Sequence, residues 1–252
     1  MKRTAILQLG IILMMLMLTG CGSDINIQND NIVAEKETLD EEMSISVYDE
    51  VLQRFYKNAT NADVDALFES EEFTNLAEVL QYQDSNAALQ SFGYTYKDIN
   101  SDGITELIIG NIREVNNGKA YGDIICNLYT CVDGEVVCLI NGSAKNVYRM
   151  FEDGKIYNSG VGGAIYYCSG IFYLSSKADE LECLDFYITH ERGDDFADIA
   201  VYYNNIGSWS PEDSTETDMT VDDFFAMDED YFKKVSDIEL IPFAEYEKGH
   251  SI

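Results

Sequence analysis

The chain has few basic residues. Lys and Arg number 16 against 46 Asp and Glu, which gives a formal net charge of −30. A protein that binds nucleic acid needs clustered basic side chains to displace counterions from phosphates, whereas a surface this acidic repels a polyanion. The composition therefore excludes nucleic acid as a partner, and it makes divalent cations natural counterions.

Catalytic and metal-binding motifs are also scarce. The chain has 2 His, no serine lies in a nucleophile elbow, and no Ser-His-Asp triad can be assembled from these residues. No CxxC pair or Cys-His cluster marks a zinc site. The glycine-rich stretch 160–163 is not followed by Lys-Ser or Lys-Thr, so we expect a bend there rather than a phosphate loop.

The apolar run near the start of the chain is too short to cross a membrane. It covers residues 5–18, fewer than the roughly 20 that a spanning helix needs. Lys2 and Arg3 precede the run, as in an export signal. The junction that follows, LTGC, resembles the lipobox of bacterial lipoproteins, in which the cysteine thiol accepts a diacylglycerol and becomes the new N-terminus. The resemblance implies lipidation at Cys21; ordinary signal cleavage and an uncleaved anchor are the alternatives.

The lipoprotein interpretation divides the chain into three parts. Residues 1–20 are the expected signal peptide, 21–43 a flexible acidic tether, and 44–252 a single globular domain. Loss of the signal peptide leaves 14 basic and 46 acidic residues, a formal charge of −32. We therefore expect a protein at the cell membrane that faces the outside of the cell. Its acyl chains, and not its acidic surface, would hold it there.

Lipidation of Cys21 leaves five cysteines, an odd number. A hairpin that turns at Asp133-Gly134 would place Cys131 opposite Val136 and Cys138 opposite Tyr129, so even the nearest pair is out of register. We expect most of these cysteines to be small buried hydrophobic residues. An occasional disulfide stays open, because the expected compartment lies outside the cytosol.

The sequence after residue 44 predicts an α+β fold with N-terminal helices, an antiparallel β-sheet or meander, and a closing C-terminal helix. A first helix begins near Ser46 and a second covers 62–80, because apolar residues recur there at helical spacing. Beyond residue 91, β-branched and tyrosine-rich runs alternate with Asp-Gly and Asn-Gly turns, which is typical of antiparallel hairpins. The expected strands are 92–99, 105–112, 123–132, 135–140, 147–151, 155–158, 164–174, 181–189, 198–203 and 238–241.

The closing helix is expected to begin at Thr220. Val221, Phe225, Phe232 and Val235 would share its apolar face. Acidic residues at its start and lysines at its end suit the helix macrodipole.

The second specific signal is the loop DINSDGITE between two expected strands. Its positions 1, 3, 5, 7 and 9 offer oxygen ligands from Asp98, Asn100, Asp102, the Ile104 carbonyl and Glu106. A glycine at position 6 permits a sharp turn. Such alternation lets hard oxygens converge on one ion, as Ca²⁺ requires. The alternative is a polar turn whose carboxylates are solvated.

The calcium loop resembles those of a known group of repeats. Position 12 is Ile109, where an EF-hand has Glu. The stretch YKDINSDGITELIIG resembles instead the strand-loop-strand calcium loops of FG-GAP and VCBS-type repeats, and it is most similar to those of certain cell-envelope lipoproteins of Firmicutes. The resemblance implies Ca²⁺ at this loop and no particular biochemical activity.

These features favour a lipid-anchored, calcium-stabilised binding or interaction domain with an envelope glycan or protein as partner. The competing hypothesis is an envelope glycan hydrolase that uses paired carboxylates, such as those among Glu191, Asp194 and Asp195. Strand aromatics could line a binding face, although alternating aromatics are more often core. The candidates for that face are Tyr166, Tyr167, Phe172, Tyr173, Tyr202, Tyr203 and Trp209.

Overall fold

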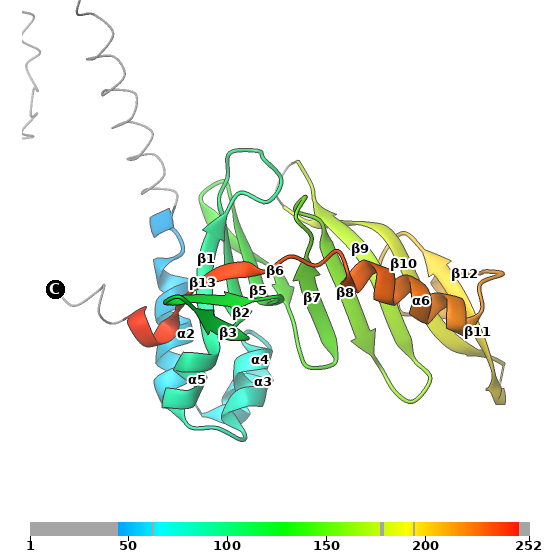
Figure 1. Cartoon of the computed structure of the whole chain (residues 1–252), viewed down its shortest axis with the longest axis horizontal. Coiled ribbons are helices and arrows are strands. Elements are labelled where there is room, and N and C mark those ends of the chain that lie inside the picture. Colours follow the sequence, from blue (N-terminus) through cyan, green and yellow to red (C-terminus); the bar gives the residue numbers. More distant parts are fainter. Residues whose placement is uncertain (1–44, 62, 177–178, 194, 247–252) are drawn as a thin grey trace, which may run out of the picture. The chain divides into compact units, whose positions relative to one another are not determined.

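A computed structural model describes residues 45–61, 63–176, 179–193 and 195–246. Within these ranges strands hold 43% of the residues and helices 28%, and thirteen strands form one antiparallel network (Figure 1). The predicted α+β class is therefore wrong, because the fold is mainly β with helices packed on a large sheet. Most of the chain after residue 92 pairs with a neighbouring strand, including short segments whose hydrophobic pattern is too weak to reveal them.

The helices lie mostly before the sheet in sequence. They are α2 (Asp49–Asn61), α3 (Val64–Ser70), α4 (Thr74–Leu80), α5 (Ser85–Ser91) and α6 (Val221–Phe232). The single helix predicted for 62–80 is split in two. Glu71 adopts a left-handed φ of 54° and ends α3. The turn that follows buries Phe73 completely, with its ring edge-on to Phe55 at 5.2 Å, so tertiary packing overrides the helical pattern.

The sheet follows the chain with few exceptions. Its order is β12-β11-β10-β9-β8-β7-β5-β2-β1-β13-β4-β3, and β6 pairs with β5. The strands are β1 (Phe92–Lys97), β2 (Glu106–Asn111), β3 (Glu114–Asn116), β4 (Lys119–Gly122), β5 (Ile124–Val132), β6 (Glu135–Asn141), β7 (Asn146–Met150), β8 (Ile156–Val161), β9 (Tyr167–Leu174), β10 (Leu181–Arg192), β11 (Asp195–Asn204), β12 (Thr215–Glu216) and β13 (Ile238–Pro242). The last strand returns to lie between β1 and β4.

Two hairpin turns test the predicted turn chemistry. Asp133 and Gly134 have φ values of 52° and 86°, and Val132 pairs with Glu135, so this is the predicted two-residue turn. The dipeptide Asp153-Gly154 also predicts a two-residue turn, but the turn there is longer. Phe151 and Lys155 are hydrogen-bonded at 2.8 Å, which leaves a loop of three residues, 152–154, between them.

The core lies on both faces of the β1–β2–β5 region. Helices α2 to α5 cover one face, where Phe55 stacks on Phe243 at 4.3 Å and Leu107 and Ile109 are fully buried. The other face buries Ile108 against a second cluster that includes residues of β6, β7 and β13. Successive residues of β2 therefore point into different cores, as a two-sided buried strand requires.

The closing helix is present, but its predicted apolar face is wrong. Thr220 forms a capping box with Asp223, and Phe224 is 1% exposed. Phe225 and Phe232 are 42% and 50% exposed. The helix lies across the β8–β11 strands (Figure 1). There it packs through Phe224 and Tyr231. The predicted face was wrong because the spacing of apolar residues does not show which side of this helix meets the sheet.

Candidate functional site

Several predicted features lie outside the residues that the structure describes. They are the signal peptide 1–20, Cys21, and the acidic tether 21–43. Among the described residues, no helix combines the length and apolar character needed to span a bilayer.

The acidic loop joins β1 to β2 through a tight, internally hydrogen-bonded turn. Ser101 and Gly103 have φ values of 62° and 89°. One oxygen of Asp98 accepts the Ser101 amide at 2.7 Å, and the other accepts the Gly103 amide at 3.0 Å. Both carboxylate oxygens of Asp98 are therefore engaged by backbone donors that shape the loop.

Asn100 and Asp102 are engaged in the same way. Asp102 Oδ1 accepts the Ile104 amide at 2.7 Å, and its Oδ2 accepts the Asn100 side-chain amide at 2.8 Å. The same Asn100 nitrogen donates to the Ser175 carbonyl at 3.0 Å. The loop is thus tied to the end of β9 through an amide N–H and not through an oxygen ligand.

Glu106 differs from the other loop acids because it is buried. Its side chain is 0% exposed, Oε2 accepts the Ile99 amide at 3.0 Å, and Oε1 accepts the Thr130 hydroxyl at 3.2 Å. The pKa of Glu106 is raised to about 7, mainly by burial and to a smaller extent by the neighbouring charges of Asp102 and Asp98, while the two hydrogen bonds oppose the shift. Removal from water disfavours the charged carboxylate more than the two donors favour it.

The hydrogen bonds of the loop do not decide whether the five predicted ligands hold calcium, because a carboxylate oxygen that accepts one hydrogen bond keeps a second lone pair. The carboxylate oxygens of Asp98, Asp102 and Glu106 already accept hydrogen bonds. Across the part of the chain that the structure describes, no group of three or more His, Cys, Asp or Glu is placed to hold a metal ion. Calcium at this loop stays a prediction.

The carboxylates named for glycan hydrolysis are not brought together among the described residues. Glu191 Oε1 accepts the Tyr166 hydroxyl at 2.9 Å, and its Oε2 lies 3.2 Å from Nδ1 of His190. Asp194 and the side chain of Asp195 lie outside the described part of the chain. Glu191 is thus held by the tyrosine through Oε1, whereas its Oε2 makes no hydrogen bond among the described residues.

The predicted aromatic set does not form one face. Tyr187 pairs with Tyr203 and Ile188 with Tyr202, so these two tyrosines of β11 point to opposite sides of the sheet. Tyr167 contacts Phe225 of α6, with the ring centroids 5.2 Å apart. Trp209 packs elsewhere, so close to the backbone of Gly160 that the Cβ of any other residue at this position would lie 2.6 Å from the indole ring. Gly160 therefore makes room for the indole within β8, and Gly162 and Gly163 lie in the predicted bend that follows the strand.

The predicted hairpin register is confirmed. Cys131 pairs with Val136 and Tyr129 with Cys138. All five cysteines within the described ranges are free thiols. Cys126 and Cys168 are buried, whereas Cys138 is exposed, so the expectation of small buried residues holds for some of the five only.

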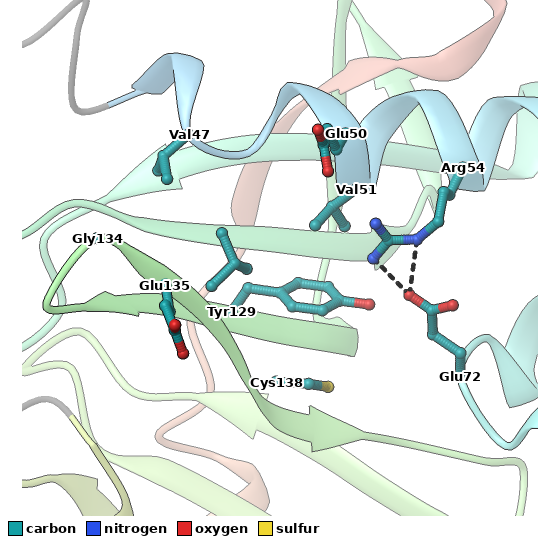
Figure 2. Close-up of a pocket in the computed structure, with 10 residues that line it drawn as sticks. Val47, Glu50, Val51, Arg54, Glu72, Tyr129, Gly134, Glu135 and Cys138 are labelled. Atoms are coloured by element: carbon teal, nitrogen blue, oxygen red, sulfur yellow. Dashed lines mark hydrogen bonds and ion pairs between the residues drawn. The ribbon is translucent and has the colours of Figure 1, made fainter.

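A cavity of about 540 Å³ lies where α2 crosses the β5–β6 hairpin (Figure 2). Residues of α2 and its N-terminal end line one side, and Tyr129, Glu135 and Cys138 line the other. Asn127 of β5 donates its side-chain amide to the Glu72 carbonyl at 2.9 Å, which ties the turn between α3 and α4 to the sheet. Glu72 consequently stands at the end of the cavity.

The polar side chains that line this cavity include an ion pair and a buried hydroxyl. Arg54 donates through Nη2 and Nε to one oxygen of Glu72, at 2.7 and 3.2 Å. The hydroxyl of Tyr129 is buried, and its hydrogen-bond partner is the thiol of its cross-strand neighbour Cys138. Figure 2 shows this hydroxyl pointing toward the Arg54–Glu72 ion pair. Burial holds the pKa of Tyr129 well above its usual range, so the hydroxyl keeps its proton.

No family model matches the chain, and neither a curated protein nor a solved structure matches it. Function therefore rests on the geometry of this chain alone. Sequence reasoning missed the cavity, although the hairpin register already set Tyr129 opposite Cys138. The missing information was the side of the hairpin on which α2 docks, and no local pattern encodes that.

Proposed function

We propose that the chain is a cell-envelope lipoprotein, anchored through Cys21 on the outer side of the cell membrane, whose β-rich domain binds a partner. The anchor is supported by the basic start, the short apolar run and the LTGC junction. The acidic composition is compatible with this location only if acyl chains supply the membrane affinity, because the protein surface itself is repelled by anionic lipid.

The observation that carries the binding role is the cavity between α2 and the β5–β6 hairpin. It combines a concave space of about 540 Å³ with an apolar wall that includes Val47, Val51 and Val136. The Arg54–Glu72 ion pair lies at its end. An apolar lining with a few placed polar groups is usual for binding sites.

Calcium at the acidic loop is a separate part of the proposal. Its support is the spacing of Asp98, Asn100, Asp102 and Glu106 and the mutual repulsion of the three acids. Ion binding is expected to be weak, with a dissociation constant on the order of 10⁻⁴ M as in extracellular modules, because Asn100 lowers the ligand charge and position 12 is Ile109 in place of a bidentate Glu.

Calcium binding is tested by thermal unfolding with two matched double variants. Asp98→Ala with Asp102→Ala should abolish the rise in melting temperature that Ca²⁺ gives the wild type. Asp65→Ala with Glu69→Ala removes the same charge from the exposed side of α3 and should keep that rise. If both variants respond like wild type, Ca²⁺ acts by screening the acidic surface and the loop is only a turn.

The anchored binding role is tested by phase partitioning in a detergent that clouds on warming. The full chain, expressed with its own signal in a bacterium that processes lipoproteins, should enter the detergent phase, and Cys21→Ser should enter the aqueous phase or stay unprocessed. The glycan hydrolase alternative is tested on the same preparation by release of reducing ends from purified envelope glycan. Steady release by the wild type would replace the binding role with catalysis.

A further inference from the structure

Strand β6 has one edge that no other strand occupies. The strand is seven residues long and pairs with β5 alone among the described residues. Edge strands are usually protected against pairing with another chain by a very short length, a proline or charged side chains. β6 contains no proline, and its single charged residue is Glu135, beside the turn. The outer edge of β6 is therefore a template on which a further strand can pair.

The hairpin register identifies the backbone groups on that edge. Val132 and Glu135 flank the two-residue turn, so these two residues form a hydrogen-bonded pair. Hydrogen-bonded and non-hydrogen-bonded pairs alternate along antiparallel strands. Val136 and Cys138 therefore direct their N–H and C=O groups away from β5. No backbone hydrogen bond joins these groups to another segment within the described ranges.

The cavity under α2 runs along the same part of β6. Val136 and Cys138 line it, and Val47 and Val51 lie across from Cys138 (Figure 2). Side chains that lie directly opposite each other on neighbouring strands share one face of the sheet. A strand that pairs with Val136 and Cys138 consequently projects two of its own side chains, two residues apart, toward the cavity. The valines of the cavity suit apolar side chains at these two positions.

The other face of this edge favours a basic partner. Successive side chains of a strand point to opposite faces, so Glu135 lies on the side of β6 away from α2. Its side chain is exposed. The formal net charge of −30 also repels an acidic segment and attracts a basic one. A second copy of this chain carries the same charge, which opposes pairing between two β6 edges.

We propose that the β6 edge binds an extended segment of a basic partner protein by β-strand addition. The backbone of the segment pairs with Val136 and Cys138, its apolar side chains enter the cavity, and its alternate basic side chains lie on the face of Glu135. In this mode of recognition the main-chain hydrogen bonds give affinity, and pockets for alternate side chains give specificity. The inference rests on the proposed binding role and deepens it by naming the partner class.

The test is isothermal titration of the full chain in neutral detergent with the capped peptide Lys-Val-Lys-Val-Lys-Val-Lys. Its valines share one face of a strand and its lysines share the other. N-methylation of the valines blocks the N–H groups that face β6, whereas N-methylation of the lysines blocks those that face solvent, and both forms keep the charge. The valine-methylated peptide should bind about tenfold more weakly than the other two, because it loses hydrogen bonds. Equal binding of all three forms, or no binding of the unmodified peptide, would overturn the proposal.

Two variants assign the binding to this edge. Glu135→Lys should weaken the lysine peptide and strengthen one with Glu in place of Lys, each by about two- to fivefold, as expected for an exposed ion pair. Glu69→Lys makes the same charge change on α3 and should keep the preference for the lysine peptide. Val136→Pro removes an N–H from the free edge and should abolish binding at little cost in melting temperature, because edge strands tolerate proline there.

The control for the proline variant is Val137→Pro, which removes an N–H that bonds to β5 and should lower the melting temperature much more. Equal destabilisation by the two prolines, or equal effects of Glu135→Lys and Glu69→Lys on the peptide preference, would contradict the assignment to the β6 edge. These results are separable from the proposed function, because failure of the peptide to bind leaves the membrane anchor untouched, whereas release of reducing ends from glycan would refute the binding role itself.

Discussion

Glu106 is the described acid whose environment most disfavours its charge, and replacing it with Gln gives a sharp test of the structure. The carboxylate is 0% exposed and accepts from the Ile99 amide and the Thr130 hydroxyl. Gln keeps the shape and an acceptor oxygen but cannot ionise. Glu106→Gln should therefore remove the cost of a buried charge wherever the wild type is ionised.

The size and sign of the effect follow from the pKa. The folded protein has a Glu106 pKa of about 7, against the ordinary value of 4.5. Below about pH 4.5 both folded and unfolded states hold the proton, and the side chain carries no ionic penalty. Between 4.5 and 7 the folded state binds more protons than the unfolded state, so stability falls as the pH rises. Above pH 7 the full penalty of about 3 kcal/mol applies.

The assay is urea unfolding of the full chain at several pH values from 4.5 to 8. At pH 8, Glu106→Gln should be more stable than the wild type by up to about 3 kcal/mol, and near pH 4.5 the two should agree within about 1 kcal/mol. Glu69→Gln, an exposed acid of α3, corrects for the general effect of removing one negative charge. A difference between Glu106→Gln and wild type that does not change with pH would refute the buried-charge argument.

Three further perturbations test the packing and the thiols. Phe55→Ala should lose about 3 to 5 kcal/mol of unfolding free energy in urea titration, because the ring is fully buried between other aromatic rings. Thr220→Ala should lose about 1 kcal/mol, measured in the same way, because it removes the α6 capping box; no loss would show that the box does not hold the helix. In the folded protein a thiol reagent should modify exposed Cys138 and leave buried Cys126 untouched until urea is added. Equal rates for the two thiols would contradict the described burial.

The strand positions could be predicted because their signals are local. The runs that became β1, β2, β5 and β6 are dense in β-branched and aromatic residues, and Asp133-Gly134 forms the turn that its dipeptide favours. The fold class was wrong because short strands carry little pattern. Glu114–Asn116 is fully exposed, so its only signal was the Asn117-Gly118 dipeptide, whose φ values of 52° and 80° make the β3–β4 turn.

The sites were harder to predict because they depend on contacts between distant segments. The spacing of the acidic loop showed which side chains carry oxygen, but not that Glu106 would be buried beside Thr130, 24 residues away. Neither Arg54 nor Tyr129 stands in a motif. They line one cavity only because α2 docks across the β5–β6 hairpin, a consequence of core packing around Phe55 that no sequence spacing encodes.

The membrane anchor is the central claim, and the mass of the N-terminal peptide of the protein from bacterial membranes tests it most directly. The proposal predicts that proteolysis yields a peptide beginning at Cys21, heavier than its amino acids by a diacylglycerol group. In Cys21→Ser the N-terminal peptide should lack that group, and the protein should no longer enter the detergent phase. A peptide containing residues before Cys21, or one beginning at an unmodified residue, would contradict the anchor and the location derived from it.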